Sequence, residues 1–240
     1  MDISARTRLL IGGENAEKLK NASVAVFGVG GVGGFVVEAI ARSGVGHITV
    51  FDNDTVAESN INRQIIATVP TLGKDKTQLI RERVLAINPQ AVVDCNNVFY
   101  LPENADLYPF DGYDYVIDAV DTVAAKIEII RRAKAAHVPV ISCMGTGGKT
   151  DITALKVADI KDTKQCPLAR VMRRELAARN ISGVKVVYSE EPAVRIDGVE
   201  HPEKRQSGRP VPASMIFVPA AAGLMLAREV VFDLIKQKTF

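Results

Sequence analysis

A short apolar segment that runs directly into a cluster of glycines constrains this chain more than any other feature. Residues 22–27 read Ala-Ser-Val-Ala-Val-Phe, and the next six are Gly28-Val29-Gly30-Gly31-Val32-Gly33. An apolar run of this length, bounded by glycine, is typical of a buried parallel strand. Residues 33–43 then carry apolar side chains at helical spacing. The segment is therefore expected to fold as a strand, a tight loop and a helix.

The same alternation continues as far as residue 142. Further strands are predicted at residues 47–51, 91–95, 115–117 and 138–142, and helices at 74–88 and 122–137. Strands that alternate with helices build a parallel sheet through right-handed crossovers. The predicted fold class is therefore α/β, a doubly wound, Rossmann-like, mainly parallel sheet.

Residues 149–240 follow a different pattern. We predict a strand at 153–159, a helix at 167–180, a strand at 184–188 and a final helix at 220–236. Residues 191–212 are rich in proline, glycine and charge, and are predicted to form a long loop, which is usually a functional feature. Two regions are thus expected: residues 1–148 bind the nucleotide, and the mixed α/β extension 149–240 completes the same domain and supplies a substrate-docking surface.

The amino-acid composition restricts the class of protein to which this chain can belong. Hydrophobic residues make up 47% and charged residues 24%, as in a soluble globular enzyme, and the net charge of +2 implies no particular partner. Cys95, Cys143 and Cys166 include no C-x-x-C pair, which argues against a disulfide framework and a structural zinc site. Residues 1–10 do not resemble a signal peptide, and the most apolar stretch, 215–227, is shorter than the roughly 20 residues of a membrane span. We expect a cytoplasmic protein without an integral membrane span.

The glycine cluster predicts a nucleotide site. Gly28, Gly30 and Gly33 satisfy G-x-G-x-x-G between a strand and a helix, and Gly31 belongs to the same loop. Such a loop lets phosphates approach the backbone at the positive end of the following helix. Asp52 ends the second predicted strand, where a carboxylate can accept hydrogen bonds from ribose hydroxyls. The loop alone does not distinguish NAD, FAD and ATP.

Polar residues beyond the loop favour ATP. They follow the second and fourth predicted strands and comprise Asp54, Asn60, Arg63, Lys76 and Asp121. A pyrophosphate can be held by backbone amides, whereas a triphosphate under nucleophilic attack needs cations and a metal. Taken singly, Arg63 fits a solvated loop and Lys76 fits a helix surface. In this order and context, they favour a triphosphate site.

The arrangement of these residues, over about residues 6–148, resembles the ubiquitin-activating-enzyme-like superfamily of adenylating enzymes. The resemblance implies ATP and Mg²⁺ as cofactors, with Asp52 at the ribose, Asn60, Arg63 and Lys76 at the phosphates, and Asp121 as the metal ligand. It also implies a homodimer in which an N-terminal arginine reaches into the partner's active site. Arg8 occupies that position, although Arg6 also fits it. The implied catalytic set is Arg8, Arg63, Lys76 and Asp121.

Four further segments resemble the branch of this superfamily that dehydrates threonylcarbamoyladenosine in tRNA. They are Arg8–Gly12, Ile117–Asp121, Pro167–Ala169 and Lys185–Pro192. This resemblance implies that ATP activates the threonyl carboxylate of N6-threonylcarbamoyladenosine at position 37, and that the side chain then cyclises with net loss of water. Activation makes chemical sense, because AMP is a better leaving group than hydroxide. Whether a sulfur-relay protein is a partner is left open.

The predicted helix that begins at Pro167 carries a basic face. Arg170, Arg173 and Arg174 share this face, opposite Met172 and other apolar residues. Such arginines can contact tRNA phosphates and bind with steep salt dependence. The alternative is the solvated face of an ordinary amphipathic helix.

Three other functions stay open. The first is an adenylating activator of a ubiquitin-like or sulfur-carrier protein C-terminus, although such enzymes usually carry two C-x-x-C zinc pairs, and Cys166 has no evident activating group. The second is a nicotinamide oxidoreductase, for which no hydride-transfer acid or base is evident. The third is a non-catalytic binding module, against which Arg63, Lys76 and Asp121 argue together.

Overall fold

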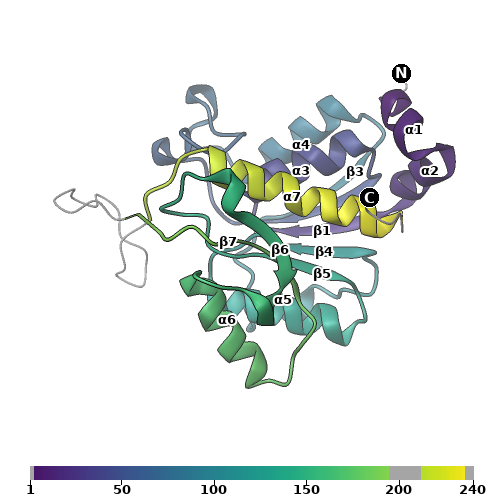
Figure 1. Cartoon of the computed structure of the whole chain (residues 1–240). Helices are drawn as coiled ribbons and strands as arrows, with labels where there is room; N and C mark the ends of the chain where they lie inside the picture. Colours follow the sequence, from purple (N-terminus) through teal and green to yellow (C-terminus); the bar gives the residue numbers. More distant parts are fainter. Residues whose placement is uncertain (1–2, 195–211, 236–240) are drawn as a thin grey trace.

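The computed structural model describes residues 3–194 and 212–235, which form a seven-stranded sheet covered by helices on both faces (Figure 1). The strand order is β3-β2-β1-β4-β5-β7-β6, and all neighbours are parallel except β6 and β7. The strands are β1 (Ser23–Phe27), β2 (His47–Phe51), β3 (Val92–Asn96), β4 (Tyr115–Asp118), β5 (Val140–Cys143), β6 (Leu155–Asp159) and β7 (Lys185–Ser189). The predicted doubly wound, mainly parallel α/β fold is confirmed. Most of the predicted 191–212 loop lies outside the described residues.

Helices pack against both faces of this sheet, because successive side chains of a buried strand point to opposite faces and both sets are apolar. Val24 and Val26 belong to a core shared with α3, α4 and α7, whereas Ala25 and Phe27 belong to a second core shared with α5 and α6. The helices are α1 (Ala5–Ile11), α2 (Gly13–Asn21), α3 (Gly33–Ser43), α4 (Lys76–Ile87), α5 (Val123–Ala135), α6 (Pro167–Ala177) and α7 (Phe217–Leu234). In the described residues no helix has the length and apolar character needed to cross a bilayer.

The second half of the chain extends the same sheet rather than forming another. The antiparallel strand β6 lies at the edge, and β7 returns between it and β5. The strand predicted at 153–159 begins only at Leu155, because the side chain of Asp151 accepts a hydrogen bond from the amide of Thr153 and starts a 3₁₀ turn. Helix α7 begins at Phe217, three residues before the predicted start, and Pro219 fits its first turn.

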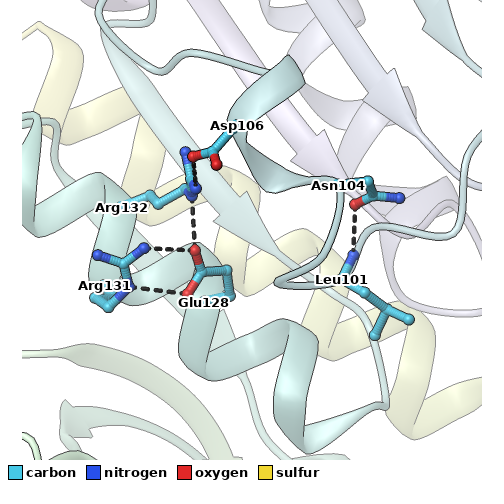
Figure 2. A network of polar contacts seen from close by, with 6 residues as sticks. All are labelled: Leu101, Asn104, Asp106, Glu128, Arg131 and Arg132. Atoms are coloured by element: carbon cyan, nitrogen blue, oxygen red, sulfur yellow. Dashed lines mark hydrogen bonds and ion pairs between the residues drawn. The ribbon is translucent and has the colours of Figure 1, made fainter.

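Figure 2 shows a polar network that attaches the segment between β3 and β4 to α5. The buried carboxylate of Glu128 accepts hydrogen bonds from Arg131 (2.6 and 2.8 Å) and from Arg132 (2.7 Å), and Arg132 also pairs with Asp106. The hydrogen bonds from Arg131 are the main cause that keeps the pKa of Glu128 below its usual range. Asp106 lies in the 3₁₀ turn Ala105–Leu107, so the network joins two elements that are distant in sequence.

Candidate functional site

The glycine loop lies where β1 and β4 meet, which is the topological switch point of the sheet. In open α/β sheets this crevice, at the carboxyl ends of the strands, is where ligands bind. The loop connects β1 to α3, and the first residue of α3 is Gly33. The amino end of α3 therefore faces the same end of the sheet, where the positive end of the helix dipole favours an anion.

Two of the four predicted glycines cannot be replaced without strain. Gly28 has φ of +81°, and a Cβ there would lie 3.0 Å from the carbonyl oxygen of Ala119. A Cβ on Gly33 would lie 1.8 Å from the carbonyl oxygen of Gly28, which is a severe overlap. Gly30 and Gly31 are less constrained, since a Cβ on either would make ordinary contacts with Gln64 or Arg63. The backbone of the loop therefore packs closely against itself and against the residues that follow β4.

Asp52, at the end of β2, supports the glycine loop directly. Its carboxylate accepts the amide of Val29 at 2.8 Å through Oδ2 and the amide of Asp54 at 2.9 Å through Oδ1. Burial raises the pKa of Asp52, and the nearby charge of Lys76 works in the opposite direction. Each carboxylate oxygen has a second acceptor position, so ribose hydroxyls could be bound without breaking either contact.

Lys76 is brought to this edge of the sheet by Asp54. The ammonium of Lys76 lies 2.7 Å from Oδ2 of Asp54, and the amide of Lys76 donates to the carbonyl of Asp54 at 3.1 Å. The lysine side chain is buried, whereas the carboxylate of Asp54 is exposed. Lys76 is the first residue of α4, and its burial argues against the alternative of a solvated helix surface.

Asn60 and Arg63 lie in the connection between β2 and α4. The buried side chain of Asn60 accepts the amide of Ala57 at 3.2 Å. Arg63 donates to the carbonyl of Ser59 at 2.6 Å and to Oδ1 of Asn62 at 3.0 Å, and its methylenes lie beside Gly31. Contacts within one short segment therefore hold Asn60 and Arg63 in place, and they leave Arg63 beside the glycine loop.

Asp121 follows β4 and is exposed. The two residues before it touch the glycine loop, since Ala119 donates its amide to the carbonyl of Phe27 at 2.8 Å and packs against Gly28. The described residues contain no group of three or more histidine, cysteine or acidic side chains able to hold a metal. Mg²⁺ that takes most of its ligands from phosphates and water needs only one or two carboxylates. Asp121 fits that requirement.

Arg8 lies away from this crevice. It belongs to α1, where its guanidinium is 3.7 Å from Glu17 of α2, and α2 leads into the amino end of β1. Figure 1 accordingly shows α1 on the side of the last turns of α7 and away from its first turns, where Pro219 packs on the glycine loop. Within one chain, Arg8 is therefore separated from the other predicted catalytic residues.

The three arginines of α6 also lie outside the crevice, and they are not equivalent. Arg173 is half-buried and donates to the carbonyl of Thr163 at 2.8 Å, with a second short contact to its hydroxyl. Arg170 is exposed, and Arg174 is exposed and pairs with Glu175 at 2.9 Å. The shared face exists, but one of its arginines is engaged within the fold.

Sequence reasoning assigned no role to three polar residues near the crevice. Oε1 of Gln64 is buried without a partner in the described part of the chain, next to Gly30. Lys126 and Ser142 are fully buried and contact Asp118, the last residue of β4. The sequence could have pointed to Lys126 and Ser142. A lysine among the isoleucines of α5 and a serine within an apolar strand both break the expected apolar periodicity.

Comparison with known proteins identifies the relationship. The family model described as "ThiF family" matches residues 4–239. The chain belongs to the ThiF family. This confirms the resemblance to adenylating enzymes that the sequence motifs indicated.

Proteins similar to this chain match it over three quarters of its length or more. A Bacillus subtilis (strain 168) protein named tRNA threonylcarbamoyladenosine dehydratase is 42% identical over 240 residues, which cover 97% of this chain and 94% of that protein. An Escherichia coli (strain K12) protein of the same name is 36% identical and is matched over 73% of its length. The solved structure of E. coli TcdA in complex with ATP has a TM-score of 0.86 and 31% identity, covering 96% of this chain and 93% of that one.

Proposed function

We propose that this ThiF-family protein is an ATP-dependent tRNA-modifying dehydratase, which adenylates the threonyl carboxylate of N6-threonylcarbamoyladenosine at position 37 and cyclises the side chain. The observation that carries the proposal is the 42% identity to a dehydratase of that name across nearly the full length of both chains. The crevice at the glycine loop supports it, because the carboxylate of Asp52 and the cations Arg63 and Lys76 lie around that loop, as an ATP site requires.

The chemistry follows from the charges of the crevice. A carboxylate oxygen attacks the α-phosphorus of ATP and displaces pyrophosphate, so two anionic groups must approach each other. Arg63 and Lys76 offset this charge, while the amides at the start of α3 hold the phosphates in position. Mg²⁺ held by Asp121 would neutralise charge on the phosphates. A nucleophilic atom of the same carbamoyl side chain then attacks the acyl carbon and releases AMP, which completes the net loss of water.

The tRNA is proposed to dock on the second half of the chain. Arg170 and Arg174 present exposed guanidiniums on α6, whose first residue follows Cys166 close to Gly145 in the loop after β5. That loop lies beside the segment after β4, because β4 and β5 are parallel neighbours. A phosphate chain bound along α6 would therefore begin near the crevice that holds ATP.

The active assembly is proposed to be a homodimer in which Arg8 serves the partner's crevice. Arg8 pairs with Glu17 of α2, which leads into the amino end of β1, whereas the glycine loop follows the carboxyl end of that strand. Its neighbours Leu9 and Leu10 are 88% and 79% exposed. Two adjacent leucines in water are disfavoured unless another surface covers them. A two-fold axis would place both arms symmetrically. Cytoplasmic location and a sulfur-relay partner remain predictions.

Mass spectrometry of nucleosides tests the proposed reaction. Threonylcarbamoylated tRNA incubated with the protein, ATP and Mg²⁺ should yield a nucleoside lighter by one water, together with AMP and pyrophosphate. The matched control is tRNA that lacks the threonylcarbamoyl group. Activation of a protein C-terminus in place of tRNA would replace this proposal by that of a carrier-protein activator. Partial matches to adenylyltransferase/sulfurtransferase proteins, such as 39% identity over 48% of this chain, leave that reaction as the second candidate.

A further inference from the structure

Three fully buried polar side chains meet directly beneath the crevice. The ammonium of Lys126 lies 2.9 Å from Oδ2 of Asp118 and 3.3 Å from Oγ of Ser142, and the serine hydroxyl donates to Oδ2 of Asp118 at 2.5 Å. The residues come from α5, β4 and β5, and the side chains of Lys126 and Asp118 have no exposed surface at all. We call this set the Lys126 cluster.

The Lys126 cluster is buried too deeply to touch a nucleotide bound in the crevice. It does contact the residues after β4, which lie beside the glycine loop. Oδ1 of Asp118, the oxygen that does not contact Lys126, accepts the amide of Val120 at 3.2 Å. The residue between them, Ala119, donates to the carbonyl of Phe27 and packs against the positions where Gly28 and Gly33 would carry a Cβ. Ala119 and Val120, the two residues before Asp121, are thereby held between the cluster below and the glycine loop beside them.

Burial of such an ion pair is not an efficient way to stabilise a core. Desolvation of two charges offsets most of their attraction, and apolar side chains of similar volume often replace a buried pair at no loss of stability. A paired and hydrogen-bonded carboxylate does, however, hold its own backbone in one conformation more strictly than an apolar side chain can. The location of the pair, one residue below the Ala119–Asp121 segment, matches this second role.

We propose that Lys126 is a positioning residue. Through Asp118 and Ser142 it fixes the Ala119–Asp121 segment, and so sets where the Asp121 carboxylate lies relative to the phosphates held by the glycine loop. The inference rests on the proposed function in one respect, since Asp121 is taken to act at those phosphates. Lys126 itself does not contact substrate or ATP.

The test removes both charges at once. Lys126→Met alone would leave an unpaired buried carboxylate, which endangers folding, so the informative variant is Lys126→Met combined with Asp118→Asn, whose amide oxygen can still accept from Val120. A matched control is Glu38→Gln with Arg83→Met, which removes an ion pair of 2.5 Å between α3 and α4, away from the Ala119–Asp121 segment. Circular dichroism and thermal unfolding establish that both variants fold.

Three measurements then separate positioning from a merely structural role. ATP affinity, measured by calorimetry, should stay within about threefold of the parent, while the single-turnover rate of AMP formation on modified tRNA should fall at least roughly tenfold. Adding Asp121→Ala should lower that rate little further in the cluster variant, but by its full factor in the control, because only coupled sites are non-additive. Amide hydrogen exchange of Val120 should accelerate in the cluster variant alone.

The outcomes are distinct. Unchanged exchange at Val120, or additive effects of the cluster variant and Asp121→Ala, would overturn the positioning role. Absence of AMP formation by the parent would overturn the proposed tRNA reaction instead. In that case the exchange of Val120, measured with ATP bound, still decides whether the cluster fixes the segment.

Discussion

At the scale of single residues, we propose that one carboxylate of the crevice acts in ATP binding and another in the reaction. Asp52 lies at the inner wall and holds the loop through Val29, whereas Asp121 is exposed beside the expected phosphates. Asp52→Ala should therefore weaken ATP affinity by about 10- to 100-fold, the equivalent of one charge-assisted hydrogen bond. Asp121→Ala should leave affinity nearly intact and lower turnover by roughly 100-fold. Calorimetry and steady-state kinetics measure both quantities, with the exposed Asp111→Ala as control. Equal losses of affinity and turnover in both variants would contradict these roles.

A second residue-scale prediction concerns acid stability. The arginines around Glu128 lower its pKa below 4.5, so its ionised form stabilises the native state. That contribution is complete above about pH 4.5 and is lost as pH falls through the lower, folded-state pKa. Glu128→Gln should reduce the free energy of unfolding by about 2 kcal/mol at pH 7, and by less at pH 3.5. Urea unfolding at both values measures this, with the exposed Glu103→Gln as control. A deficit that is independent of pH would contradict the electrostatic cause.

At the scale of elements, α6 is the proposed contact with tRNA. Because Arg173 anchors Thr163, only Arg170 and Arg174 can be changed without disturbing the fold. Replacing both with glutamate should weaken tRNA binding roughly tenfold and reduce the slope of log affinity against log salt by about 2, while ATP affinity stays constant. Filter binding across a salt series measures this. The control reverses two exposed charges elsewhere, Lys20 and Arg81. Tight tRNA binding with an unchanged salt slope would exclude α6 as the docking surface.

The helices and strands also show which parts of the fold and of the site could be predicted from the sequence. Residues 33–43 and 47–51 were predicted with the observed bounds, because apolar spacing and flanking glycines act locally. Asp52 meets the glycine loop because β1 and β2 are parallel neighbours that end at the same edge of the sheet. The placement of β7 between β5 and β6 was not predictable, since strand order depends on pairing between distant segments. The hydrogen bonds of Arg173 with Thr163 and of Lys126 with Asp118 were not predicted either, because each depends on how a helix packs against the segment before it and not on residue spacing within the helix.

At the scale of the whole molecule, a variant that lacks Arg8 and a variant that lacks Lys76 should restore activity to each other in a mixed dimer. A mixture of Arg8→Ala and Lys76→Ala chains, each inactive alone, forms heterodimers in which one crevice has both side chains. With free exchange, roughly a quarter of all sites should become active. Native mass spectrometry verifies the exchange, and AMP formation measures the activity. Exchange without recovered activity would place the action of Arg8 within its own chain.

The course of α7 across the sheet has a consequence for biosynthesis. Its first turns pack on the glycine loop, where Pro219 lies beside Gly31 and a Cβ on Gly223 would lie 2.5 Å from the carbonyl oxygen of Val32. Its last turn reaches the opposite end of the sheet, where the strands begin, and there Asp233 accepts a hydrogen bond from the hydroxyl of Tyr115 at 2.7 Å. A chain still on the ribosome can form β1 and α3 early, but α3 keeps an uncovered apolar face until the final helix emerges. The β1–α3 motif is thus translated early but completed late, and a nascent chain should acquire nucleotide binding only after synthesis reaches α7.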